Sequence, residues 1–187
     1  MKTRCSWCGQ DPLYIKYHDK EWGVPVHSDR KLFEFLVLEG AQAGLSWITI
    51  LHRRTGYRKA FDQFDFNKIA NYKERKVQSL LKNTGIIRNQ LKIRSTINNA
   101  AAFIKVRDEY DTFNKYIWQF VDGSPIKNKH KTIKEIPAQT SLSDLISKDL
   151  KQKGFTFIGS TICYAYMQAI GMVNDHVVEC FRYNELI

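Results

Sequence analysis

The sequence has few prolines, few cysteines and no long apolar run. Only four of its 187 residues are proline, which argues against an extended, disordered chain. No apolar run reaches the roughly 18 residues that a membrane-spanning helix requires, and residues 1–10 lack the apolar centre of a signal peptide. We therefore expect a cytoplasmic protein without a membrane segment. In such a protein, the four cysteines indicate metal binding, catalysis or core packing rather than disulfides.

The composition indicates a folded, basic protein. Hydrophobic residues make up 43% of the chain and charged residues 26%, which is ordinary for a globular domain. Lys and Arg number 29 against 19 Asp and Glu, a net charge of +10. A surplus of this size favours a polyanionic partner, most simply nucleic acid. The alternative is that the charge serves solubility alone.

Hydrophobic periodicity predicts an all-α fold of roughly eight to ten short helices. Strands are expected to be nearly absent, and no linker or internal repeat is visible. Residues 126–139 are basic, lack a clear period and are expected to form a long loop. The expected helices cover residues 12–23, 31–38, 46–51, 52–64, a short segment after Asp65, and residues 74–81, 92–106, 141–154, 159–170 and 174–181.

The stretch LEGAQAGLSW at residues 38–47 places a carboxylate among small and apolar residues. Apolar spacing over residues 31–38 predicts a core helix that ends near Glu39, where an ionised group is costly without a partner. Gly40 and Gly44 are expected to break the helix, and Ser46 to cap the next one. Two interpretations remain open: a solvated carboxylate at a helix junction, or a functional carboxylate close to Leu45 and Trp47.

Thiols and imidazoles occur near both ends of the chain. His176 and Cys180 are four residues apart in a segment predicted to be helical, so both would face one metal ion. Cys5, Cys8 and His18 are candidates for the two further ligands of a tetrahedral site. Spacing alone does not choose among these three, and ordinary core packing is the alternative for the His–Cys pair.

Aromatic residues crowd the same regions of the sequence. Flat side chains with polar tips suit a pocket that stacks a nucleobase and hydrogen-bonds its edge. Core filling is the alternative, and a carboxylate among the rings favours the pocket. The aromatic candidates are Trp7, Tyr14, Tyr17, Trp22 and Trp47.

A short polar turn at about residues 83–92 joins two predicted helices. A helix–hairpin–helix element offers backbone N–H groups at Gly85 to a DNA phosphate, and Arg88 and Lys92 would add positive charge. The pattern is weak because Ile87 occupies the position where such hairpins often have a second glycine. A plain αα-hairpin is the alternative.

Several motifs together resemble the bacterial 3-methyladenine DNA glycosylase I family. These are Cys5, DPLYIKYHDKEWGVP at 11–25, LEGAQAGLSW at 38–47, the hairpin, and GFTFIGSTICYAYMQAIGMVNDHVVEC at 154–180. The resemblance covers nearly the whole chain. It implies one domain over residues 1–187 in the helix–hairpin–helix superfamily, with two helical lobes and a structural zinc site that joins the chain termini.

The resemblance also implies an activity. Such an enzyme flips 3-methyladenine out of alkylated double-stranded DNA and releases it by hydrolysis, leaving an abasic site in base excision repair. It would be monofunctional and would act in the bacterial cytosol as a monomer without an obligate protein partner. The chain has no confident equivalent of the wider superfamily's catalytic aspartate, and no hairpin lysine placed as a lyase nucleophile.

Residue roles follow from the resemblance position by position. The zinc ligands would be Cys5, His18, His176 and Cys180, which leaves Cys8 spare and Cys163 in the core. Glu39 would be the catalytic carboxylate that hydrogen-bonds the base, and Leu45 would enter the duplex beside Gly44. The base-binding residues would be Tyr17, Trp47, Tyr14, Trp7 and Trp22, and the DNA contacts Gly44, Leu45, Gly85, Arg88 and Lys92.

Two other classes of protein compete with this interpretation. A zinc-stabilised, non-catalytic module that binds distorted duplexes would explain the charge, hairpin, aromatics and metal, but would give Glu39 no purpose. A zinc hydrolase is disfavoured, because four protein ligands leave no open position for water.

Overall fold

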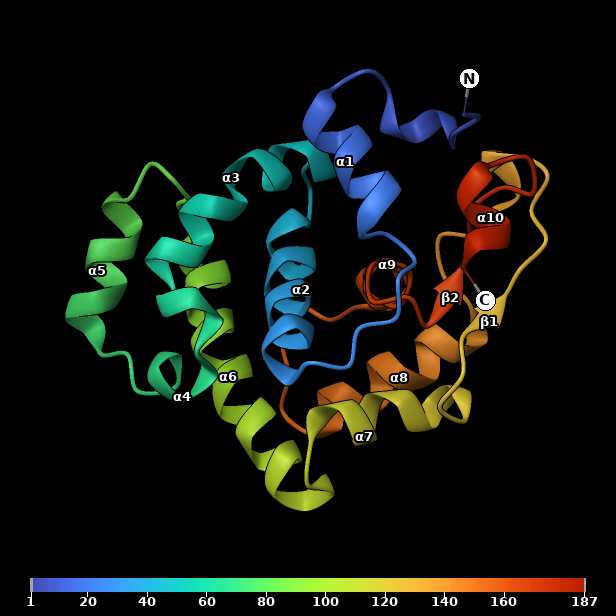
Figure 1. Cartoon of the computed structure of the whole chain (residues 1–187). Coiled ribbons are helices and arrows are strands. Elements are labelled where there is room, and N and C mark those ends of the chain that lie inside the picture. Colours follow the sequence, from blue (N-terminus) through green and yellow to red (C-terminus); the bar gives the residue numbers. More distant parts are fainter. Residues whose placement is uncertain (1, 187) are drawn as a thin grey trace.

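The chain folds almost entirely into helices in a computed structural model that describes residues 2–186 (Figure 1). The all-α expectation is confirmed, apart from one pair of two-residue strands. The α-helices of the described chain are α1 (Pro12–Lys20), α2 (Asp29–Gln42), α3 (Trp47–Ala60), α4 (Phe66–Ile69), α5 (Glu74–Lys82), α6 (Gln90–Tyr110), α7 (Phe113–Trp118), α8 (Ser141–Gln152), α9 (Ser160–Ala169) and α10 (Phe181–Glu185). Short 3-10 turns are η1 (Ser6–Cys8), η2 (Asp62–Phe64), η3 (Gln119–Val121) and η4 (Ile133–Glu135).

Helix α2 is the centre of the fold. Every residue from 32 to 41 is buried, because α2 packs against α3, α6, α7 and α9 (Figure 1). The predicted end near Glu39 is wrong, since the helix continues through Gly40 to Gln42. A side chain at Gly40 would lie 3.5 Å from the Phe157 carbonyl oxygen. Burial of the whole stretch from residue 32 to residue 41 outweighs the low helix propensity of Gly40, and Glu39 lies inside the helix.

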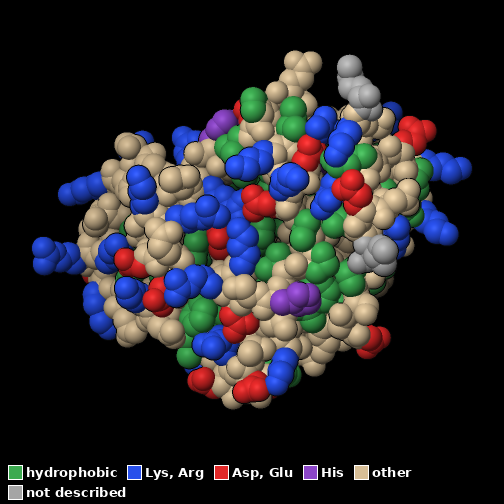
Figure 2. Space-filling view, in the orientation of Figure 1, with side chains coloured by type: hydrophobic (Ala, Val, Ile, Leu, Met, Phe, Trp, Pro, Cys, Tyr) green, Lys and Arg blue, Asp and Glu red, His purple; other side chains and the backbone are tan. Residues whose placement is uncertain are grey.

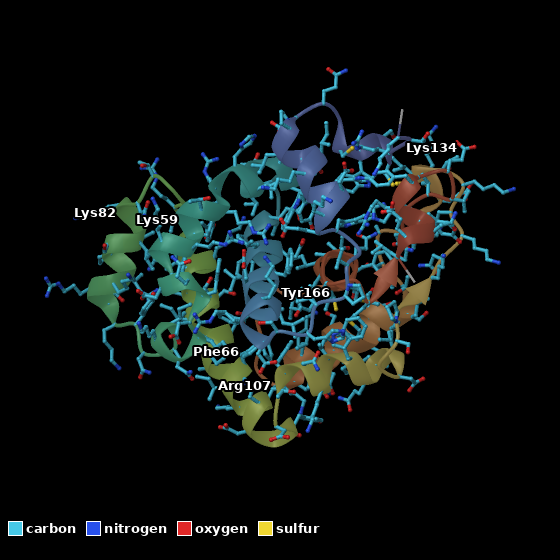
Figure 3. The ribbon with its side chains drawn as sticks, viewed as in Figure 1. Lys59, Phe66, Lys82, Arg107, Lys134 and Tyr166 are labelled. Carbon is cyan, nitrogen blue, oxygen red and sulfur yellow. The ribbon has the colours of Figure 1, made fainter. Side chains whose placement is uncertain are left out.

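Helix α9 crosses the interior beside α2. The Tyr166 hydroxyl, fully buried, donates a hydrogen bond to the Leu32 carbonyl oxygen at 3.2 Å. Figure 3 shows Tyr166 in the interior between the two helices. This contact fixes the position of α9 relative to α2.

Helix α3 is one continuous helix, although two were expected with a boundary at Leu51. It includes Gly56, where a Cβ atom would lie only 2.2 Å from the Gly85 carbonyl oxygen. The absence of a side chain therefore lets the turn between α5 and α6 pack directly on α3. Figure 3 shows Lys82 at the end of α5 from which this turn departs.

The segment at 174–181 is not the helix that was predicted. Strand β2 (Val173–Asn174) pairs in parallel with β1 (Ile126–Lys127), and α10 begins only at Phe181. The Asn174 amide also donates to the carbonyls of Tyr183 and Leu186. These tertiary contacts override the local helical pattern.

Other boundaries differ by smaller amounts. Helix α1 ends at Lys20 rather than Gly23, whereas α8 begins at Ser141 as expected, with Thr140 as its N-cap. The 126–139 segment is mostly loop, as expected, with β1 and η4 within it. Segments 2–20 and 174–186 lie side by side, since the Phe181 N–H donates to the Thr3 carbonyl at 3.0 Å (Figure 1). Across residues 2–186, no helix has the length and apolar character needed to cross a membrane.

Candidate active site and metal centre

A pocket of about 270 Å³ lies between α1, α2, α3, α9 and the 126–139 loop. It brings together all six residues that the sequence placed in a base pocket: Glu39 and the five aromatic candidates. Its full lining is Trp7, Tyr14, Tyr17, Trp22, Glu39, Gln42, Trp47, Ile133, Ile136, Ala165 and Gln168. The expected juxtaposition is therefore present.

Glu39 is the buried acid of this pocket. The residue is 4% exposed, and its carboxyl group forms no hydrogen bond or ion pair with any other residue between 2 and 186. Burial raises its pKa to about 8. A solvated helix cap would be exposed and would keep an ordinary pKa, so that interpretation is wrong.

Aromatic rings form rigid walls around the carboxyl group. The rings of Trp7 and Trp22 meet edge to face with centroids 4.9 Å apart, and Tyr17 packs against Trp47 at 5.3 Å. The Trp47 Nε1 atom is buried and has no hydrogen-bond partner in the described chain. Burial raises the pKa of the Tyr17 hydroxyl, with a smaller contribution from nearby Glu39. The hydroxyl is therefore neutral and can donate a hydrogen bond.

Five lining residues were missed by the sequence reasoning. Gln42 follows Glu39 by three positions in one helix, a spacing that could have identified it. Ala165 and Gln168 have the same spacing on α9, but nothing in their local sequence indicates a pocket. Ile133 and Ile136 come from the 126–139 loop, whose irregular sequence gave no signal.

A second cavity, of about 340 Å³, shares Glu39, Gln42 and Ala165 with the first. Its remaining lining includes Gly44 and Leu45 from the turn between α2 and α3. Gly44 adopts a φ of 77°, a left-handed conformation that glycine accepts without strain. Leu45 is 39% exposed at this turn. The acid pocket therefore borders an exposed apolar side chain.

The residues of the turn between α5 and α6 differ in whether their polar groups already have partners within the protein. The Gly85 N–H donates to Asn83 Oδ1 at 2.8 Å, and the neighbouring Ile87 N–H donates to the Tyr57 hydroxyl at 3.3 Å. These two N–H groups therefore have partners within the protein. Arg88 is exposed and forms no hydrogen bond or ion pair with the described residues.

Lys92 faces inward, toward the end of α2. Its ammonium group donates to the carbonyl oxygens of Ala41 and Ala43, both at 2.7 Å. A cation at a helix C-terminus stabilises the unpaired carbonyls there. Lys92 thus connects α6 to the turn that carries Gly44 and Leu45.

The region around the hairpin carries many basic groups. Lys and Arg side chains are spread over the face formed by α3, α5 and α6, with fewer acidic groups among them (Figure 2). Such a surface favours a polyanion.

Four buried side chains from both ends of the chain converge on one point. One donor atom from each lies within 4.8 Å of all the others: Cys5, His18, His176 and Cys180. His176 and Cys180 converge from an irregular segment, so the expected helical face is not what brings them together. Cys8 is excluded because its thiol donates to the Cys5 carbonyl at 3.2 Å.

The geometry of this cluster fits a tetrahedral metal. Zinc–sulfur and zinc–nitrogen bonds of about 2.3 and 2.0–2.1 Å place adjacent S and N ligands roughly 3.6 Å apart. The Sγ atoms of Cys5 and Cys180 lie 3.5 and 3.4 Å from His176 Nδ1. Cys180 Sγ lies 3.5 Å from His18 Nε2. The four residues could therefore hold one metal ion.

The outer nitrogens of both histidines have partners that fix their rings. His18 Nδ1 lies 2.8 Å from an Asp19 carboxylate oxygen, and His176 Nε2 lies 3.2 Å from the Trp22 carbonyl oxygen. Arg4 hydrogen-bonds Asp19 and lowers the pKa of that carboxyl to about 2. Partners of this kind orient metal-binding imidazoles.

Comparison with known proteins places the chain in a family. Residues 7–183 match the family described as methyladenine glycosylase. DNA-3-methyladenine glycosylase 1 of Escherichia coli is 51% identical over 96% of both chains. A crystal structure of 3-methyladenine DNA glycosylase I, 51% identical, superposes with a TM-score of 0.94 over 96% of this chain and 98% of that chain. A variant of such an enzyme in complex with 3-methyladenine is 31% identical, with a TM-score of 0.93 over 95% and 96%. The chain belongs to the methyladenine glycosylase family.

Proposed function

We propose that the Glu39 pocket binds the 3-methyladenine base. As a methyladenine glycosylase, this chain releases that base from alkylated DNA by hydrolysis. The reaction cleaves the N-glycosyl bond in base excision repair, releasing the free base and leaving an abasic site. The observation that carries the assignment of the site is a buried carboxyl group without a partner among residues 2–186, enclosed by aromatic rings.

The charge of the lesion matches the acid of the pocket. Methylation at N3 makes adenine cationic in DNA, so the base leaves as a neutral molecule and needs no strong acid. A buried carboxylate attracts such a cation strongly, because the surrounding dielectric is low. Binding of the cation would offset the desolvation that raises the pKa of Glu39 to about 8. The cost of burying the acid would thus be recovered when the lesion binds.

Hydrogen bonding would select adenine. The Glu39 carboxylate would accept from the exocyclic amine, where guanine presents a carbonyl oxygen and would be repelled. Tyr17 would supply a second polar contact, and Trp47 a stacking face. The other aromatic residues, Trp7, Tyr14 and Trp22, would exclude water around the base.

The turn after α2 would occupy the gap that the flipped nucleotide leaves. Apolar side chains commonly wedge between base steps in this way. Leu45 is exposed at the rim of the cavity that joins the Glu39 pocket, and Gly44 allows the tight turn. Lys92 would hold this turn in place through the Ala41 and Ala43 carbonyls.

Affinity for duplex DNA would be mainly electrostatic. The net charge of +10 supplies sequence-independent, salt-dependent binding. Arg88 is free to contact phosphate, and the Gly85 turn would place it there.

The Cys2His2 cluster would hold a structural zinc ion. Its four ligands would be Cys5, His18, His176 and Cys180, and the ion would cross-link segments 2–20 and 174–186. Four protein ligands leave no position for a reacting water, so a zinc hydrolase is disfavoured.

Residues 1–187 would act as one domain with two sub-lobes, one with the termini and one with the hairpin. A continuous buried core that includes residues from Cys5 to Cys180 supports a single domain. We expect the enzyme to act as a monomer in the cytosol, where its DNA substrate is found.

Incubation with methylated duplex DNA tests the function. The wild-type protein should release free 3-methyladenine, identified by chromatography, and leave alkali-labile sites in the DNA. Tight binding to the duplex without release of base would instead support the non-catalytic module.

A further inference from the structure

Asp175 is a fully buried carboxylate on the far side of the pocket wall. It accepts hydrogen bonds from the Asn128 amide at 2.6 Å, the Tyr164 hydroxyl at 2.6 Å and the Gln168 amide at 2.7 Å. His130 Nε2 lies 3.3 Å from the same carboxylate. Asp175 is 0% exposed, so the three hydrogen bonds from Asn128, Tyr164 and Gln168 compensate its loss of hydration.

The carboxylate determines which way the Gln168 amide faces. The NH2 end of Gln168 faces Asp175, because the side-chain nitrogen Nε2 donates to Asp175 Oδ2 at 2.7 Å. The carbonyl end, Oε1, is then the other terminus, and no described residue donates to it. Gln168 also lines the pocket that contains Glu39. Gln168 therefore brings to the pocket lining a carbonyl acceptor that has no partner among residues 2–186.

We propose that Gln168 is a specificity-determining residue whose Oε1 atom accepts a hydrogen bond from the exocyclic amine of the bound base. The inference rests on the proposed function, because it assumes that 3-methyladenine occupies this pocket. An amine carries two hydrogens, so Glu39 and Gln168 each accept one. Guanine presents a carbonyl oxygen at the corresponding position, where two oxygens face each other without a proton between them.

Asp175 is the positioning residue for this contact. It touches no atom of the base, and it acts by keeping the Gln168 amide from rotating. Through Asn128 it also anchors the loop that contributes Ile133 and Ile136 to the pocket. One carboxylate thus fixes both a polar contact and part of the apolar lining.

The test is the ratio of kcat/KM for 3-methyladenine to kcat/KM for 3-methylguanine, measured on the same methylated duplex. Gln168→Met keeps the side-chain length and removes the acceptor. We expect it to lower the ratio about tenfold, the effect of one buried hydrogen bond, chiefly by slowing adenine release. Gln168→Leu provides the same measurement in a smaller side chain if methionine does not fit. Asp175→Asn should lower the ratio less, because its amide still offers one acceptor.

Tyr116→Phe is the matched control for destabilisation. Like the Gln168 variants, it removes one hydrogen bond to an aspartate. This bond runs from the Tyr116 hydroxyl to Asp149 at 2.6 Å, at a site that does not line the pocket. Its ratio should equal that of the wild type. If Gln168→Met and Gln168→Leu slowed both lesions equally, Gln168 would be structural only and the inference would be overturned. Failure of the wild-type protein to release 3-methyladenine would refute the proposed function itself.

Discussion

The Nε2 atom of His18 lies 3.5 Å from the Sγ atom of Cys180, although 162 positions separate the two residues in the sequence. Cys5 and His176 complete the same cluster from opposite ends of the chain. This cluster also stands next to the pocket, since the Trp7 ring lies 5.2 Å from the His18 ring and itself lines the pocket. The cluster that joins the two ends of the chain is therefore in contact with a wall of the pocket.

Removing a cluster thiol should remove the metal. We expect about one zinc ion per folded chain, and we expect Cys180→Ser to lower both zinc content and the melting temperature, because ligation and folding are coupled. Cys8→Ser is the control, since Cys8 is buried nearby but donates only to the Cys5 carbonyl. Metal analysis and thermal unfolding measure both. Equal zinc content and stability in the two variants would reject the zinc site.

Lys92→Met should disturb the turn after α2. Loss of the ammonium group leaves the Ala41 and Ala43 carbonyls without their donor, so we expect a loss of about 1 kcal/mol in unfolding free energy and slower excision. The salt dependence of DNA binding should hardly change. Urea denaturation and single-turnover excision measure these effects.

Arg88→Met is the matched variant, because Arg88 is an exposed cation of the same hairpin. Removing one phosphate contact should leave stability unchanged and reduce the slope of log K against log salt by about 1. The account of Lys92 is wrong if Lys92→Met reproduces this pattern.

Leu45→Ala should weaken insertion into the duplex. A shorter side chain fills less of the gap left by a flipped nucleotide, so we expect roughly a tenfold decrease in single-turnover excision with little change in stability. Leu145→Ala is the control, because Leu145 is 54% exposed on α8 and does not line either cavity. Equal excision rates for the two variants would remove Leu45 from the wedge role.

Stability should depend on pH through Glu39. The pKa of Glu39 is raised by burial to about 8 in the folded chain, against an ordinary value of about 4.3 when unfolded. The folded chain therefore binds more protons between these values, so the free energy of unfolding decreases as pH rises from about 4.3 to 8. Tyr14 and Tyr17, which face Glu39, stay neutral in this range because their pKa values are also raised.

Glu39→Gln isolates this contribution, because every other titrating group is common to both proteins. The variant should gain stability relative to the wild type as pH rises, by at most about 5 kcal/mol over the full range. Chemical denaturation at several pH values measures the difference. A difference that does not vary with pH would show that Glu39 keeps an ordinary pKa.

Local patterns predicted the helices but not the contacts that override them. Apolar periodicity predicted α5 and α8. Helix α2, however, continues past Gly40, which is buried against Phe157. At Asn174, strand pairing occurs where a helix was expected. The spacing of His176 and Cys180 indicated a metal site because both residues were expected on one face of a helix, but they lie in an irregular segment. Nothing along the chain indicated Gln168, because its role depends on Asp175 and on a loop some 40 residues earlier in sequence, whose placement only the fold determines.

The central claim is that the buried Glu39 carboxylate drives release of 3-methyladenine. The direct measurement is single-turnover release of free base from methylated duplex DNA, with chromatographic identification of the product, for the wild type and Glu39→Gln. We predict that the wild type releases 3-methyladenine and that the variant, still folded and still binding DNA, loses about a hundredfold or more in rate. Full activity of Glu39→Gln would contradict the account and leave Glu39 without a part in catalysis.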